Sequence, residues 1–189
     1  MRELSLHLLD LLENAVTAGA SLVVVEIALE PEWNLLRITV EDNGPGLSVS
    51  PEQATNPFYT TKKGKKTGLG LSLFRFRIEQ AGGELALERS PLGGLAVRAT
   101  IGLSHIDRNP VGDLASTISS VLAANPELKL SLCIRVNGRE QTITSSDVAR
   151  ELIAPDDLVF SEKTLSNLSI ARRMYLKIKA GLAALQIEE

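Results

Sequence analysis

The chain lacks several features that would place it in a specialised class. It has one cysteine, Cys133, in 189 residues, which excludes an internal disulfide and a metal centre held by cysteines alone. It contains no stretch of about 18 apolar residues, the length that a membrane span requires. Its N-terminal stretch, MRELSLHLLD, is interrupted by Glu3, His7 and Asp10, so no signal peptide is expected. We therefore expect a cytoplasmic protein without a membrane partner.

Positive charge is not in excess either. The chain has 20 lysines and arginines against 23 aspartates and glutamates, and its net charge is -3. A nucleic-acid-binding domain is typically basic, so nucleic acid is not expected as a partner. The run from Lys62 to Lys66 is a local exception, and a solvated loop is its ordinary explanation. With 44% hydrophobic residues, the chain is long enough to bury a core as one large or two small domains.

A first helix is predicted from about residue 3 to residue 18. Apolar residues recur there at helical spacing, at Leu4, Leu8, Leu11, Leu12 and Ala15. Four polar residues, His7, Asp10, Asn14 and Thr17, share another stripe of the same helix. By itself such a stripe is more often a solvated face than a site.

An antiparallel pair of strands is predicted next, from residues 21–30 and 34–42. The second strand ends at Asp42, which is followed by Gly44 and Gly46. These glycines permit positive φ and let a flat ligand lie against the main chain. Turns rich in Asp, Asn and Gly are common between strands, so this motif alone is weak evidence for a site.

A glycine-containing helix start follows at residues 68–70, after a polar, basic loop. Free amides in the first turn and the helix dipole both favour an anion there. The alternative is a flexible loop with an N-terminal cap, since neither a P-loop nor a dinucleotide fingerprint is matched.

The order of these pieces resembles a known family. Four motifs follow one another over residues 3–103. They are an acid and an amide four residues apart on a helix, a strand pair ending in Asp-x-Gly-x-Gly, the stretch PFYTTK and the stretch TGLGLS. This order resembles the ATP-binding domain, or Bergerat fold, of the GHKL superfamily, which includes histidine kinases, type II topoisomerases, a heat-shock chaperone and mismatch-repair ATPases. The chain looks like a short stand-alone form. The resemblance implies an α+β fold in which helices and a sheet make a two-layer α/β sandwich.

The resemblance also implies roles for individual residues. Asp42 accepts a hydrogen bond from the adenine amino group, Asn14 is a ligand of Mg²⁺, and Asp10 activates the water that attacks ATP. The remaining residues implied at the nucleotide are Gly44 and Gly46 under the base, and Lys62, Thr67, Gly68, Leu69 and Gly70 around the phosphates.

Two positions depart from the family pattern. Mismatch-repair and topoisomerase relatives have a glutamate where this chain has Asp10, which is one methylene shorter, so slow hydrolysis is expected. Family members often have a threonine where Leu95 stands, so a weaker or drier adenine site is expected at that position.

Two domains are expected, an ATP-binding domain over residues 1–104 and a small α+β domain over residues 105–189. The second contains predicted helices at 113–124 and 145–152, a hairpin that turns at Asn137-Gly138, and a terminal amphipathic helix over about 162–185. Apolar residues recur in that helix at two heptad positions. Leu168, Tyr175 and Leu182 share one position, and Ala171, Ile178 and Leu185 share the other. This stripe permits a homodimer, although packing against the helix's own domain is the more common arrangement.

Three functions remain open. The protein is an ATPase switch that engages an unidentified protein partner, a protein kinase that phosphorylates a separate histidine or serine substrate, or a sensor that binds nucleotide without turnover. A kinase would have to act on another protein, because only nine residues precede Asp10 and His7 lies inside the first helix. As a neighbour of Asp10, His7 could instead hold that carboxylate in place.

Overall fold

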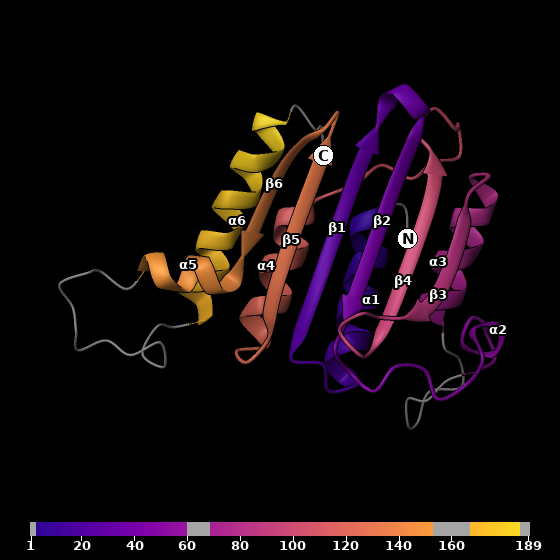
Figure 1. Ribbon diagram of the computed structural model, residues 1–189, viewed down its shortest axis with the longest axis horizontal. Helices are drawn as coiled ribbons and strands as arrows, with labels where there is room; N and C mark the ends of the chain where they lie inside the picture. The colour runs from indigo at the N-terminus through magenta and orange to yellow at the C-terminus, as the bar shows by residue number, and fades with distance from the viewer. Residues whose placement is uncertain (1–2, 60–68, 153–166, 186–189) are drawn as a thin grey trace.

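The computed structural model describes residues 3–59, 69–152 and 167–185. They form a mixed six-stranded sheet with helices packed on one face (Figure 1). The helices are α1 (Leu4–Thr17), α2 (Pro51–Ala54), α3 (Leu69–Gln80), α4 (Leu114–Ala124), α5 (Ser145–Leu152) and α6 (Asn167–Ala184). The strands are β1 (Leu22–Glu30), β2 (Leu35–Asp42), β3 (Glu84–Arg89), β4 (Leu95–Gly102), β5 (Lys129–Val136) and β6 (Arg139–Thr144), and the short 3-10 helix η1 (Pro31–Trp33) joins β1 to β2. This is the two-layer α+β fold expected from the sequence.

The strands lie in the order β3-β4-β2-β1-β5-β6. β1 and β2 pair antiparallel around η1, as their β-branched sequences predict. β1 also pairs with β5, in parallel. β1 therefore uses both of its edges and lies in the interior of the sheet.

One hydrophobic core extends under the whole sheet. Alternate side chains of β1, such as Val23, Val25 and Ile27, point into it, as the two-residue period of a strand requires. Leu132 and Ile134 of β5 belong to the same cluster. The sheet and the core thus both continue across residue 104, where a domain boundary is expected; the division into two domains stays a prediction.

The opposite face of the sheet carries paired charges. Arg98 binds Glu41 and Glu88, and Arg135 binds Glu26 and Glu140. Partly exposed ion pairs of this kind add little stability. They keep the uncovered face polar, so the helical face holds the core.

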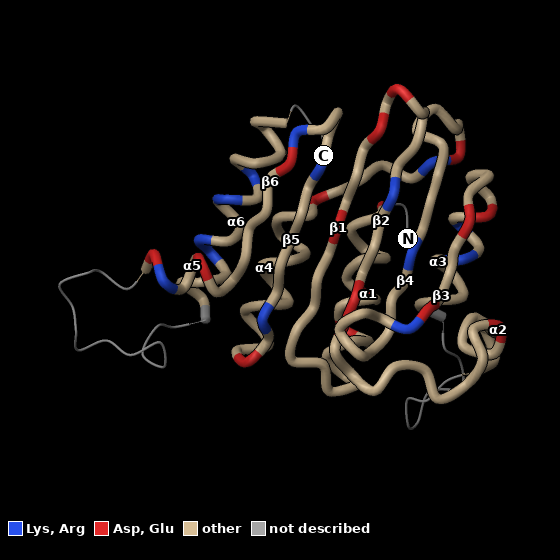
Figure 2. Tube along the Cα trace, in the orientation of Figure 1, with Lys and Arg blue, Asp and Glu red and all other residues tan. Residues whose placement is uncertain are grey.

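Helix α6 packs against α4 and β6 through a buried stripe. Ala171, Met174, Ile178 and Leu182 are buried within the chain, while Leu168 is exposed. Three members of the heptad pattern are therefore core residues of this chain, and a homodimer through the helix stays a prediction. The helix bears lysines and arginines and no acidic residue (Figure 2).

Among the described residues, no helix is at once long enough and apolar enough to span a membrane.

Candidate functional site

Helix α1 forms one wall of the site and is fixed at both ends. At its start, the amides of Leu4 and Ser5 donate to the carbonyls of Pro110 and Val111, at 2.9 and 2.8 Å. At its end, Gly19 has φ +90° and closes the helix as a Schellman cap. A helix held in this way presents its side chains from a rigid support.

Asp10 and Asn14 of α1 face the first turn of α3. A Cβ added at Gly70 would lie 3.5 Å from Asn14 Nδ2 and 3.6 Å from Asp10 Cβ. Both polar side chains are partly exposed. The structure thus brings together three of the residues that the sequence singles out, with glycine leaving the space between the two helices open.

A divalent cation at this place would depend on Asn14 and on the ligand. The described residues include no group of three or more His, Cys, Asp or Glu side chains that could hold a metal. Mg²⁺ is commonly held by one or two protein oxygens, by water and by substrate phosphates. The donor set therefore fits Mg²⁺ bound together with a nucleotide.

Asp42 lies at the end of β2 and is 7% exposed. Its Oδ1 accepts hydrogen bonds from the amides of Gly44, at 2.8 Å, and Leu95, at 3.2 Å. Within the part of the chain that the structure describes, no group donates to Oδ2. Hydrogen bonds to Oδ1 therefore orient the carboxylate, and Oδ2 accepts none from the described residues.

Gly94 completes the surroundings of Asp42, and the sequence reasoning missed it. A Cβ at Gly94 would lie 2.0 Å from Asp42 Oδ1 and 2.6 Å from Gly44 N. Gly46 has φ +76°, and a Cβ there would lie 3.4 Å from Gly94 O. Two stretches of backbone, residues 42–46 and 94–95, thus meet around one carboxylate. The clue in the sequence is the pair Gly93-Gly94 just before β4.

Asn43 fixes the chain immediately after Asp42. Its Oδ1 accepts from the amides of Ser21 and Leu22, both at 2.9 Å, and its Nδ2 donates to Ser21 Oγ at 3.0 Å. The Asp-Asn pair therefore divides its roles: Asn43 joins the loop to the start of β1, and Asp42 faces the site.

Three of the expected site residues, Lys62, Thr67 and Gly68, lie outside the described residues. Leu69 begins α3, and its side chain is not described. The chain just before this stretch is attached to α3, because Arg75 Nη1 donates to Thr55 Oγ1 at 2.8 Å.

His7 departs from the expectation that it supports Asp10. Its side chain is fully buried, and neither ring nitrogen has a hydrogen-bond partner among the described residues. The ring stacks on Phe74 of α3, with 5.2 Å between centroids. Burial lowers the pKa of His7 to about 4. Three residues of the polar stripe of α1, namely His7, Asp10 and Asn14, thus face α3, a direction that helical periodicity alone does not reveal.

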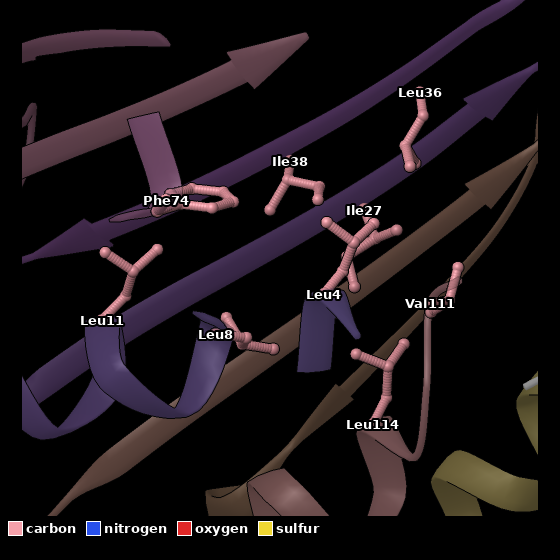
Figure 3. Close-up of a pocket in the computed structure, with 9 residues that line it drawn as sticks. All are labelled: Leu4, Leu8, Leu11, Ile27, Leu36, Ile38, Phe74, Val111 and Leu114. Carbon is pink, nitrogen blue, oxygen red and sulfur yellow. The ribbon is translucent and has the colours of Figure 1, made fainter. Parts of the chain in front are cut away.

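A separate cavity lies beneath α1 (Figure 3). It has a volume of about 10 Å³ and is lined by Leu4, Leu8, Leu11, Ile27, Leu36, Ile38, Phe74, Val111 and Leu114. A space of that size holds about one water, and an apolar lining leaves it dry. It is a packing gap in the core, and a nucleotide does not fit there.

The site combines an acid and an amide opposite a helix start with a buried carboxylate at a strand end. These are the features of an ATP-binding fold. Residues 2–105 match the family described as histidine kinase-, DNA gyrase B-, and HSP90-like ATPase. The chain belongs to this family, and these residues form an ATP-binding domain similar to the catalytic domains of histidine kinases.

Individual relatives match over part of their length. The chain is 36% identical over 92 residues to the sensor histidine kinase CpxA of Escherichia coli, covering 46% of this chain and 20% of the relative. It is 31% identical over 121 residues to the non-motile and phage-resistance protein of Caulobacter vibrioides, covering 58% of this chain and 14% of that protein. The chain thus spans a fifth or less of these two relatives, and their activities as whole proteins do not carry over.

One solved structure, the N-terminal domain of a DNA repair protein, has a TM-score of 0.48 and 14% identity, covering 76% of this chain and 52% of that one. It adds nothing to the assignment.

Proposed function

We propose that the protein is a Mg-ATP-dependent regulatory switch that hydrolyses ATP slowly and engages a protein partner in one nucleotide state. One observation carries the proposal: Asp10 and Asn14 of α1 converge on Gly70 at the start of α3. A helix start favours anions, so a triphosphate would lie where an acid and a metal-binding amide can both reach it.

The adenine end of the site follows from the geometry of Asp42. Oδ1 is held by two backbone amides, so Oδ2 would accept the adenine amino group. A site built around a buried acceptor rejects bases that lack the matching donor. This arrangement favours adenine over guanine.

The phosphate end rests on Asn14 and Asp10. Asn14 would supply one oxygen to Mg²⁺, whose charge offsets that of the phosphates. Asp10 would accept a proton from the attacking water, directly or through a second water. Because an aspartate is one methylene shorter than a glutamate, we propose slow turnover, which suits a switch that must stay in one state long enough to be read.

The test of this proposal is phosphate release by the purified protein with ATP and Mg²⁺. Asp10→Ala should abolish release while nucleotide binding is kept. Glu13→Ala is the matched control, because Glu13 is an exposed acid on the same helix and lies on another side of it. Equal phosphate release by wild type and Asp10→Ala would contradict the proposed role of Asp10.

A protein kinase is the second candidate, and the similarity to sensor histidine kinases favours it. In that case the terminal phosphate of ATP would pass to a residue of a separate protein. Transfer of label from the terminal phosphate to a partner, without release to water, would distinguish the kinase from the switch. Nucleotide binding without either phosphate release or phosphate transfer would identify a non-hydrolysing sensor.

A further inference from the structure

The interface between α1 and α3 contains a buried polar side chain without a partner. His7 is 0% exposed, and within the part of the chain that the structure describes both of its ring nitrogens lack a hydrogen bond. Native proteins retain few such groups, and each one calls for an explanation. Neither the adenine site nor the phosphate site described above uses this ring.

His7 lies one helical turn from the place where α1 approaches the start of α3. On α1 it precedes Asp10 by three residues, and on α3 its stacking partner Phe74 follows Gly70 by four. These spacings correspond to about 4.5 and 6 Å along the two helix axes. The ring pair and the Asp10–Gly70 approach are therefore neighbouring contacts along one helix–helix interface.

The stacked pair is enclosed by the rest of the protein. The two ring planes meet at 29° with centroids 5.2 Å apart, and Phe74 is 2% exposed. The adjoining side chains below α1 are apolar, including Leu8 and Leu11 (Figure 3). Close-packed interiors transmit small displacements, so a change in ring separation would move the first turn of α3 relative to α1.

We propose that His7 is a positioning residue for the phosphate end of the nucleotide site. Its uncharged ring, stacked on Phe74, sets the separation between the stripe of α1 that carries Asp10 and Asn14 and the first turn of α3. The adenine end lies on β2 and the turn before β4, which are other elements than the α1 and α3 pair that carries the two rings. The inference rests on the proposed function, and it predicts an effect on ATP that adenosine does not share.

Two variants separate ring stacking from simple packing. His7→Leu removes the ring and keeps an apolar side chain, while His7→Phe keeps a stacked ring. Both replace unpaired polar atoms with carbon, so neither should destabilise the fold strongly. Ser5→Ala is the matched control, because Ser5 is a buried polar residue on the same helix whose neighbour is Gly112 of the segment before α4.

The experiment is calorimetry with ATP and with adenosine, both in magnesium buffer. We expect His7→Leu to bind ATP about tenfold more weakly than the wild type, because small misplacements of binding groups have large effects. Its affinity for adenosine and its thermal stability should be no lower than those of the wild type. His7→Phe and Ser5→Ala should bind ATP as the wild type does.

Equal losses for ATP and adenosine in His7→Leu, or no loss for either, would overturn the inference. A loss in His7→Phe as large as in His7→Leu would also overturn it. Absence of ATP binding by the wild type itself would overturn the proposed function, and the inference with it. The two failures are therefore distinguishable.

Discussion

Replacing Gly94 with alanine should disable the adenine site without unfolding the protein. The new Cβ would lie 2.0 Å from Asp42 Oδ1 and 2.6 Å from the carbonyl oxygen of Asp42. These distances are far below van der Waals contact, so the carboxylate or the turn must move. Either movement breaks the hydrogen bond from the Leu95 amide to Asp42 Oδ1, which is 3.2 Å long.

The expected size of the effect follows from that bond. A hydrogen bond to a charged acceptor contributes about 2 kcal/mol, which corresponds to about a 30-fold rise in the Kd for ATP. The measurement is calorimetric titration of the variant, after circular dichroism has shown that it is folded.

Gly93→Ala is the control for this prediction, because it tests backbone strain alone. Gly93 has φ +105°, and no atom lies within 4 Å of an added Cβ. Alanine there should cost about 1 to 3 kcal/mol of stability and leave the Kd of the folded protein unchanged. If Gly94→Ala binds ATP like the wild type, or if both variants lose affinity equally, the reasoning about Asp42 is wrong.

Three further predictions concern the fold, the loop before α3 and pH. A chain truncated after residue 104 should not fold, because β1 would lose its parallel partner β5 and α1 would lose the carbonyls of Pro110 and Val111; circular dichroism and solubility report this. Arg75→Ala should lower stability by about 1 kcal/mol or less and weaken ATP binding measurably in calorimetry, because the partly exposed arginine joins Thr55 to α3. Burial lowers the pKa of His7 from 6.5 to about 4. The unfolded chain therefore takes up the proton first as pH falls from 6.5 toward 4, and the wild type loses up to about 3 kcal/mol of stability. His7→Phe should remove this loss, and urea unfolding at about pH 7 and about pH 5 compares the two proteins.

Much of the fold could be predicted from the sequence because its elements have local causes. The period of leucines sets α1, and β-branched runs set β1 and β2. Asn137 and Gly138 have φ of 49° and 76°, as the two central residues of a tight hairpin turn require.

The pairing of β1 with β5 has no local cause. About a hundred residues separate these strands, and two apolar strands do not reveal from their sequences that they are partners. Since β5 continues the sheet of the first hundred residues, the later part of the chain is joined to the ATP-binding part by backbone hydrogen bonds.

The site could be predicted in part. Spacing alone places Asp10 and Asn14 on one stripe of α1, and Asp42 beside its glycines at a strand end. It does not show that His7 turns into the interface with α3, because that depends on where another helix packs. Gly94 was missed for a similar reason: its closeness to Asp42 arises only when the turn before β4 folds over the end of β2.

The central claim is that adenine binds at Asp42, and calorimetry with adenine and guanine nucleotides in magnesium buffer tests it most directly. We expect the wild type to bind ATP and not GTP, and Asp42→Asn to lose ATP binding while it keeps the fold. Equal affinity of wild type and Asp42→Asn for ATP, or no binding of adenine nucleotides by the wild type, would contradict it.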